Sequence, residues 1–257
     1  MKTGIIFLLA ASFLSACAGE VDELPTSDTD AAPASIIGGT IDEGDPAVVR
    51  LQVSRPRGDD FSINHCTASV IAPTVLLTAA HCVQPSQVNG ATIRAFFGTD
   101  ALSEEGTWVN VTETHFDPAY DGSNISAGHD IAVAILEEPV SVQPLPYNRA
   151  PMTQAIVGEP VRLIGFGADD EGWDGVKRHV STTVNTVTPL LLGLGDAAHH
   201  TCQGDSGGPA LMDVNGVSTI VGVTSFGTSN NTTICADGWD TRVDLYLDFI
   251  DQFVGAP

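Results

Sequence analysis

Three widely separated residues of this chain carry the side chains needed for nucleophilic attack on an acyl group: His81, Asp130 and Ser206. A serine hydroxyl is a poor nucleophile at neutral pH because it holds its proton tightly. An imidazole can remove that proton, and a buried carboxylate can fix the imidazole in the tautomer that accepts it. The sequence therefore offers a nucleophile, a base and an orienting carboxylate, provided that the fold brings them together.

Six short motifs contain or accompany these residues. In chain order they are Ile36-Ile37-Gly38-Gly39, Leu76-Leu77-Thr78-Ala79-Ala80-His81-Cys82, His129-Asp130-Ile131-Ala132-Val133-Ala134-Ile135-Leu136, Gly165-Phe166-Gly167, Thr201-Cys202-Gln203-Gly204-Asp205-Ser206-Gly207-Gly208-Pro209 and Thr224-Ser225-Phe226-Gly227. In these motifs and their order the chain resembles the trypsin-like serine proteases, which have the chymotrypsin fold. The resemblance extends from Ile36 to the end of the chain. It implies a serine endopeptidase with a His81, Asp130 and Ser206 triad. We expect no cofactor or metal ion: Glu104 and Glu105 lie near where some relatives bind calcium, but a solvated acidic turn is favoured there.

The elements that must position these residues are predicted to be short strands. They are predicted over residues 48–53, 67–71, 75–78, 93–97, 109–114, 131–136, 161–164, 180–187 and 218–223. Turns rich in Gly, Asp, Asn and Pro separate them, a pattern typical of an antiparallel all-β domain. The exception is residues 240–254, where apolar side chains at helical spacing predict a helix.

The resemblance implies two packed six-stranded antiparallel Greek-key β-barrels with a C-terminal helix. We expect residues 36–143 to form the N-terminal barrel, and residues 144–257 to form the C-terminal barrel and the helix. The stretch 140–147 contains two prolines and is expected to cross between the barrels.

Residues 1–16 have the features of an export signal. Lys2 supplies a positive charge, and the apolar run over residues 5–14 is too short for a stable membrane span. The residues leading to Cys17 resemble a bacterial lipobox, which implies cleavage before Cys17 and lipidation of its thiol. Cleavage after Ala18 is the alternative. Both routes take the protein out of the cytoplasm, as a lipid-anchored or a secreted enzyme.

Residues 17–35 are acidic, contain proline and lack apolar periodicity, which predicts a flexible linker or propeptide. The resemblance implies a zymogen, in which cleavage before Ile36 frees an α-amino group that pairs with Asp205. The residue before Ile36 is Ser35, and no Arg or Lys lies between Cys17 and Ile36. We therefore expect an activating protease that is not trypsin-like, whose cut would also release a lipid-anchored enzyme.

The chain has five cysteines, and an odd number in an exported protein leaves one to be explained. Cys17 is the unpaired one if it is lipidated. The resemblance implies the disulfides Cys66–Cys82 and Cys202–Cys235, and hence an oxidising compartment. A metal site built from His199, His200, Cys202 and Cys235 is a weaker alternative, because it would fill the substrate pocket.

The loop around the nucleophile is expected to bind the oxyanion that forms during acyl transfer. The resemblance assigns this role to the backbone N–H groups of Gly204 and Ser206, since a glycine permits the necessary backbone conformation. It also implies that Ser225 donates a hydrogen bond to the carboxylate of Asp130.

Primary specificity is expected to depend on a pocket beside Ser206. The resemblance places His200 at its base, Gly227 and Gly238 on its walls, and Phe226-Gly227 on the edge that pairs with the substrate backbone. Relatives that cleave after Arg or Lys have an acidic residue at the base, so His200 predicts another preference. A neutral His200 predicts broad or chymotrypsin-like cleavage, which we favour, and a protonated one predicts cleavage after Glu or Asp.

Two other classes of protein were weighed. Gly204, Ser206 and Gly208 also fit the Gly-x-Ser-x-Gly pattern of α/β-hydrolases, but that fold needs a histidine after the nucleophile and all seven histidines precede Ser206. The second alternative is a catalytically inactive trypsin-like homologue that acts as a binding protein. The complete triad disfavours it.

Charge limits the partners. The chain has 32 Asp and Glu residues against 10 Lys and Arg, for a net charge of -22, and nucleic acids are bound by clustered cations. We expect protein or peptide substrates and an activating protease as partners, no nucleic acid, and contact with a membrane only through lipid on Cys17. A monomer is expected.

Overall fold

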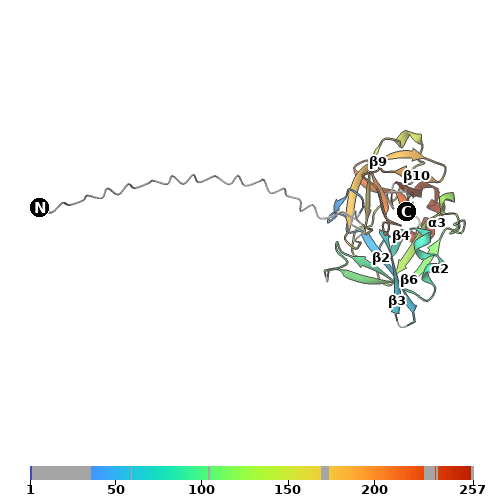
Figure 1. The fold of residues 1–257 in the computed structure, drawn as a ribbon. Helices are drawn as coiled ribbons and strands as arrows, with labels where there is room; N and C mark the ends of the chain where they lie inside the picture. The colour runs from blue at the N-terminus through green and yellow to red at the C-terminus, as the bar shows by residue number, and fades with distance from the viewer. Residues whose placement is uncertain are drawn as a thin grey trace. The chain divides into compact units, whose positions relative to one another are not determined.

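The computed structural model describes Met1 and residues 36–58, 60–103, 105–168, 174–228, 235 and 237–255. The predicted export signal, Cys17 and the linker over residues 17–35 lie outside the described residues. All strands and helices of the described chain belong to one compact unit, residues 33–257. Figure 1 shows its strands and its C-terminal helix.

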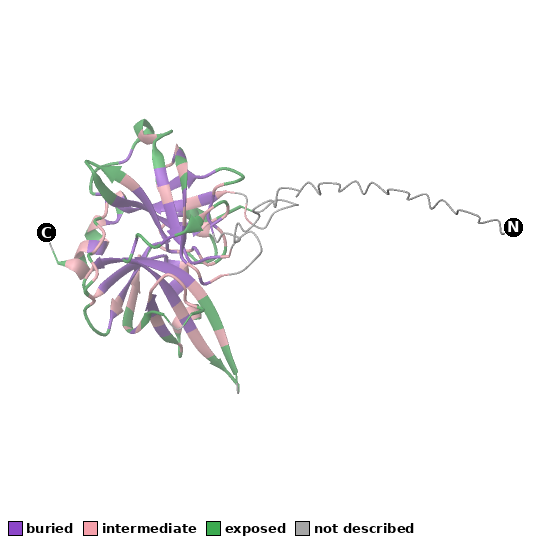
Figure 2. Cartoon of the chain, turned by 90° about the vertical axis from the view of Figure 1, so that its left-hand side faces the viewer, coloured by how far each residue is buried: buried purple, intermediate pink, exposed green. Residues whose placement is uncertain are grey.

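Six antiparallel strands close the first barrel, in the order β2-β3-β4-β7-β6-β5. They are β2 (Val48–Arg57), β3 (Asp60–Ala72), β4 (Val75–Thr78), β5 (Thr92–Phe97), β6 (Thr107–Phe116) and β7 (Ala132–Leu136). Buried Val, Leu, Ile and Ala side chains of these strands form its core. The long β2–β3 hairpin leaves the core towards its tip, where Figure 2 shows the ribbon change from buried to exposed.

The second barrel repeats this order, as β8-β9-β10-β13-β12-β11, and is closed by the pairing of β8 with β9. Its strands are β8 (Pro160–Gly165), β9 (Arg178–Val187), β10 (Leu191–Leu194), β11 (Pro209–Val214), β12 (Val217–Phe226) and β13 (Gly238–Arg242). The two-residue strand β1 (Thr40–Ile41) adds to the edge of β9. The predicted architecture of two six-stranded antiparallel barrels is confirmed.

The chain passes from the first barrel to the second between Leu136 and Pro160. Along this connection the Leu145 N–H donates to Val70 O on β3, at 2.9 Å, and the carbonyl of Pro146 accepts from Ile220 N–H on β12, also at 2.9 Å. The connection is therefore hydrogen-bonded to both barrels.

The C-terminal helix is shorter than predicted. Residues 240–242 belong to β13, a 3-10 turn covers Val243–Leu245, and α3 spans only Leu247–Val254. Pairing of β13 with both β10 and β12 explains the difference, because it satisfies backbone groups that a helix would otherwise have paired. Ile250 of α3 is fully buried in the core cluster of the first barrel, so the end of the chain holds the two barrels together.

The remaining helices are short. They are α1 (Ala80–Val83), α2 (Pro85–Val88) and 3-10 turns at Ile125–Ala127 and Gln154–Ile156. Within the described part of the chain, every helix is too short or too polar to cross a membrane.

Candidate active site

Strand pairing in the first barrel brings His81 and Asp130 together. His81 follows β4 within α1, Asp130 precedes β7, and these two strands pair with Thr78 opposite Ala132. Because the strands are antiparallel, the end of β4 lies beside the start of β7. The His81 N–H donates to Asp130 Oδ1 at 2.8 Å, and His81 Nδ1 lies 2.7 Å from Asp130 Oδ2.

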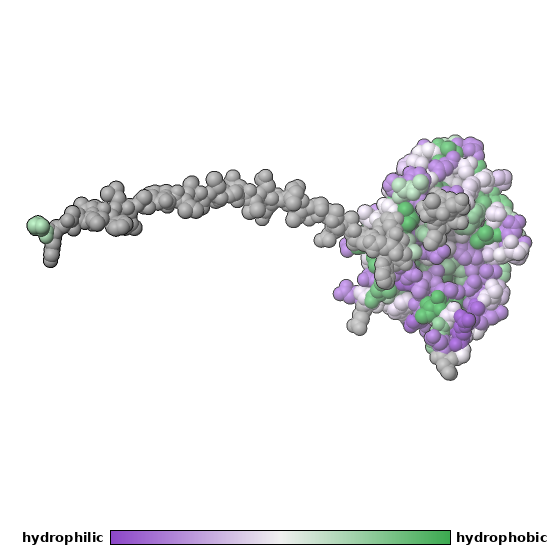
Figure 3. All heavy atoms as spheres, viewed as in Figure 1, coloured by the Kyte–Doolittle hydropathy of each residue, from purple (hydrophilic) through white to green (hydrophobic). Residues whose placement is uncertain are grey.

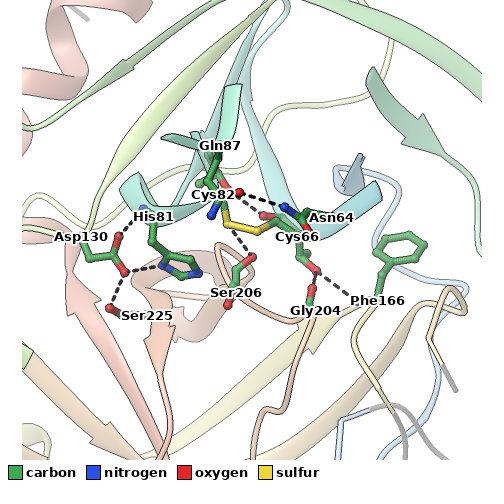
Figure 4. Close-up of a disulfide and its surroundings, with 12 residues drawn as sticks. Asn64, Cys66, His81, Cys82, Gln87, Asp130, Phe166, Gly204, Ser206 and Ser225 are labelled. Atoms are coloured by element: carbon green, nitrogen blue, oxygen red, sulfur yellow. Dashed lines mark hydrogen bonds and ion pairs between the residues drawn. A yellow bond between two sulfur atoms is a disulfide. The ribbon is translucent and has the colours of Figure 1, made fainter. Parts of the chain in front are cut away.

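The Asp130 carboxylate is fully buried and is also held by the second barrel. Ser225 of β12 donates from its hydroxyl to Asp130 Oδ2 at 2.5 Å, and Thr241 of β13 donates to the Asp130 carbonyl at 3.0 Å. Hydrogen bonds from both barrels therefore converge on Asp130, as Figure 4 shows for its carboxylate. With Asp130 at Nδ1, the tautomer protonated there leaves Nε2 of His81 free to accept a proton.

The turn that carries Ser206 is bound to the first barrel through Thr67 of β3. The Thr67 N–H donates to Ser206 O at 2.8 Å, and its hydroxyl donates to Gly204 O at 3.0 Å. The Ser206 carbonyl oxygen lies 3.7 Å from Sγ of Cys82, the residue that follows His81 in the chain. Figure 4 shows the imidazole ring of His81 pointing towards Ser206. Among the described residues the Ser206 hydroxyl has no hydrogen-bond partner, so its proton is free to be donated.

The backbone around Ser206 presents two N–H groups with no acceptor among the described residues, those of Gly204 and Ser206. Asp205 and Gly207, by contrast, donate to the carbonyls of Cys202 and Thr224. Gly204 has a φ of +95°, and a Cβ there would lie 2.8 Å from the Cα of Gly167. Only glycine fits this conformation, which leaves two adjacent donors beside the hydroxyl.

Asp205 is a second fully buried carboxylate near Ser206. The N–H groups of Gly167 and Cys202 donate to its two oxygens, each at 2.8 Å. No cation among the described residues forms an ion pair with it. Burial therefore raises the pKa of Asp205 to about 7, and the two hydrogen bonds offset only part of the rise. Ile36 is also fully buried, in the core of the second barrel.

The Gly165-Phe166-Gly167 motif makes room for Asp205. A Cβ on Gly165 would lie 2.1 Å from Asp205 Oδ1, and one on Gly167 would lie 2.6 Å from its Cγ. Distances below 3 Å require the neighbour to move. The glycines of this motif therefore have a steric role: they leave space for the buried Asp205 carboxylate, rather than for the catalytic groups.

Both predicted disulfides are present, Cys66–Cys82 and Cys202–Cys235. The alternative metal site that used Cys202 and Cys235 is therefore wrong, because these sulfurs are bonded to each other. The sulfurs of Cys66 and Cys82 lie within 4.8 Å of a His81 ring nitrogen, but their covalent bond also removes them as thiolate ligands.

A cavity of about 180 Å³ opens beside Ser206. It is lined by Thr201, Cys202, Gln203, Ser206, Thr224, Ser225, Phe226, Gly227 and Cys235. Ser225, Phe226 and Gly227 were predicted to form the pocket. Gly238 lies behind its wall, where a Cβ would be 3.0 Å from Thr201 Oγ1. His200 is not one of the lining residues; it is buried, with Nδ1 2.9 Å from Thr201 O.

The sequence analysis did not identify Thr67, Thr224 and Thr241. Thr67 and Thr241 make the hydrogen bonds between the barrels described above, and Thr224 lines the cavity. Thr67 directly follows Cys66 and begins a predicted strand. Its role could not be found from the sequence because its partners, Gly204 and Phe166, lie about a hundred residues or more away.

Comparison with known proteins agrees with the fold. The family model described as Trypsin matches residues 36–250, and the chain belongs to the trypsin family. It is 28% identical over 221 residues to a trypsin of Saccharopolyspora erythraea, covering 78% of this chain and 90% of the relative. It is 29% identical over 235 residues to a tryptase of Mus musculus, covering 79% and 83%.

A chymotrypsin-like elastase family member 1 of Bos taurus is 26% identical over 256 residues, covering 90% of this chain and 94% of the relative. These relatives carry different enzyme names, so they do not indicate one primary specificity for this chain. Fold, family and site together make the chain a serine endopeptidase.

The buried Asp205 predicts how the stability of the uncut chain depends on pH. The folded protein keeps the Asp205 proton up to a pKa of about 7, whereas the unfolded chain loses it near 3.8. Unfolding therefore releases a proton between these values, and the free energy of unfolding falls as pH rises, by up to about 1.4 kcal/mol per pH unit. Below about pH 4 and above about pH 7, Asp205 does not make the free energy of unfolding depend on pH.

Urea unfolding of the uncut Ser206→Ala protein, measured from pH 4.5 to 7.5, tests this expectation. The double variant with Asp205→Asn is the control and should lose that part of the slope. Identical slopes in the two proteins would show that Asp205 is ionised throughout.

Proposed function

We propose that this enzyme hydrolyses peptide bonds through His81, Asp130 and Ser206 by way of an acyl-enzyme. His81 Nε2 takes the proton of the Ser206 hydroxyl as the oxygen attacks the scissile carbonyl carbon. The tetrahedral oxyanion is then bound by the N–H groups of Gly204 and Ser206. His81 passes its proton to the leaving amine, and water hydrolyses the ester by the same steps in reverse.

The observation that carries this proposal is the set of hydrogen bonds around Asp130. Its carboxylate accepts from His81 twice and from Ser225, with no exposure to solvent, while the His81 side chain is 22% exposed. An imidazole oriented in this way is able to cycle between neutral and protonated forms beside a stable negative charge. The two free N–H groups next to the hydroxyl support the same reaction.

A peptide library read by mass spectrometry tests the reaction, using protein that begins at Ile36. Ser206→Ala and His81→Ala should each lower kcat/KM by at least about 10⁴-fold, because members of a catalytic triad act as a unit. A fluorophosphonate probe should label the wild type at Ser206 and leave Ser206→Ala unlabelled. Correctly folded wild-type protein that neither cleaves peptides nor reacts with the probe would favour the inactive homologue.

The same chain is proposed to be made as a zymogen. In the uncut chain Asp205 is fully buried with no cation among the described residues paired to it, and Ile36 is fully buried in the core of the second barrel. A new α-amino group at Ile36 would supply the missing positive charge. Because Asp205 directly precedes Ser206, the resulting ion pair would hold the N–H groups of Gly204 and Ser206 in place.

Activation is expected to require a free amino group on Ile36 itself. Protein that begins at Ile36 should be at least about 100-fold more active than protein with one additional residue, Ser35, at its N-terminus, because loss of an oxyanion donor costs about that much. Asp205→Asn in the Ile36 form should be equally impaired. The measurement is kcat/KM on one peptide, and equal activity of the Ser35 and Ile36 forms would contradict the zymogen.

Export, a monomeric state and control by an activating protease complete the proposal. The two disulfides are consistent with an oxidising compartment, and the lipobox at Cys17 supports a lipid anchor that the cut before Ile36 would release. On the face drawn in Figure 3, apolar residues are scattered among polar ones, as expected for a monomer. A preference for residues other than Arg and Lys is part of the proposal; His200, on which it depends, is buried and is not one of the residues that line the cavity.

A further inference from the structure

A second cavity, of about 520 Å³, lies between the end of β6 and α3 and has no role in the proposed reaction. It is larger than the cavity of about 180 Å³ beside Ser206 and shares no residue with it. Its lining residues are His115, Phe116, Asp117, Pro118, Leu245, Tyr246, Asp248, Phe249, Gln252 and Phe253. A concave surface of this volume with mainly aromatic and apolar walls is typical of a binding site. We call it the α3 cavity.

The walls of the α3 cavity contain a continuous row of aromatic rings. The ring centroids of His115 and Phe253 are 4.7 Å apart, and those of Phe253 and Phe249 are 5.5 Å apart. All three residues are only partly buried, and Leu245 in the same lining keeps 45% of its surface exposed. Apolar surface that is gathered in one hollow and bordered by polar residues marks an interaction site.

One wall of the α3 cavity is hydrogen-bonded to the segment that carries Asp130. The Tyr246 hydroxyl accepts from the His129 N–H at 3.2 Å, and the Asp117 N–H donates to Ile131 O at 3.0 Å. Asp117 Oδ1 also lies 3.4 Å from His129 Nδ1. This wall is therefore ordered before any ligand arrives, and binding does not have to supply the free energy of ordering it.

The charged groups of the α3 cavity are acidic. Asp117 and Asp248 line it, and its lining in the described part of the chain includes no Lys or Arg. The Asp248 carboxylate is exposed and has no hydrogen-bond or ion-pair partner among the described residues. His115 is the one lining residue that could carry a positive charge, and its Nε2 lies 3.2 Å from Oε2 of a third carboxylate, Glu113. Negative charge next to aromatic rings favours the side chains of Lys and Arg.

Charge also decides which chain suits the α3 cavity. The linker of this protein, residues 17–35, contains five Asp and Glu residues and no Lys or Arg, so the acidic cavity would repel it. A second copy of the chain has the same net charge of -22 and would be repelled as well. The field of so acidic a protein attracts cationic partners instead.

We propose that the α3 cavity binds a segment of a partner protein in which an apolar side chain is flanked by Lys or Arg. The apolar side chain would pack against Phe249 and Phe253, and the cations would pair with Asp117 and Asp248. Binding there would hold the partner on the enzyme without occupying Ser206. The site is independent of the proposed peptidase function, because none of its residues takes part in the hydrolysis.

Calorimetry with short peptides tests the proposal, using the full chain with Ser206→Ala so that no peptide is cleaved. The probe is acetyl-Lys-Trp-Lys amide. It should bind at least about tenfold more tightly than acetyl-Glu-Trp-Glu amide, because like charges brought together at an interface repel each other. Replacing Trp by Gly in the probe should weaken binding at least about tenfold, since the aromatic anchor is lost.

Charge reversal at one exposed residue locates the binding site. Asp248→Lys should weaken binding of the cationic probe at least about tenfold and remove its advantage over the anionic peptide. Glu159→Lys is the matched control, because it makes the same change in net charge at an exposed residue that lines neither cavity. Binding to this control should stay within about twofold of the parent, because solvent and salt screen a distant charge. The melting temperatures of both variants check that they fold.

Four results would overturn the proposal: no measurable binding of the cationic probe, equal binding of the two peptides, equal weakening by Asp248→Lys and Glu159→Lys, or tighter binding of a synthetic peptide of residues 18–35. The last would assign the cavity to the linker of this chain. A dimer in analytical ultracentrifugation that Asp248→Lys dissociates would assign it to a second copy, with the same consequence. These outcomes are separate from failure of the peptidase function, which the fluorophosphonate tests on wild-type Ser206.

Discussion

The buried carboxylate of Asp130 is the constraint on which the rest of the structure depends. A charge removed from water is tolerated only when donors replace the lost solvation. Here the donors come from both barrels, through His81 on one side and Ser225 on the other, and Thr241 binds the Asp130 backbone. Neither barrel alone would satisfy the Asp130 carboxylate. The position of the catalytic groups and the packing of the two barrels therefore depend on each other.

Two carboxylates of the active-site region, Asp130 and Asp205, have no exposed surface, and they differ in which groups satisfy them. Asp130 is fully satisfied by the folded chain. Asp205 is bound by two backbone N–H groups but lacks a cation, which suits a group that awaits a new chain terminus. Catalysis and activation are thereby assigned to separate buried charges in the proposed account.

The sequence predicted the parts whose signals are local. The motifs around His81, Asp130 and Ser206 locate the site, and apolar runs predict all six strands of the first barrel and β8, β9 and β12 of the second. Strands β1, β10, β11 and β13 were missed. Thr40–Ile41 and Leu191–Leu194 are short, Pro209–Val214 begins with a proline, and Gly238–Arg242 contains a glycine and two charges. Residues 240–242 were assigned to a helix instead. Which face of β13 a charged residue occupies depends on strand register, which only the pairing of β12 with β13 reveals.

The most direct test of the account is the turnover of Asp130→Asn, which keeps the shape of the side chain and removes its charge. With protein that begins at Ile36, kcat at neutral pH should fall about 10⁴-fold, because an amide favours the wrong imidazole tautomer and does not stabilise imidazolium. KM should remain within about threefold, since the cavity beside Ser206 does not include Asp130. A kcat within about tenfold of wild type would contradict the central role of the buried carboxylate.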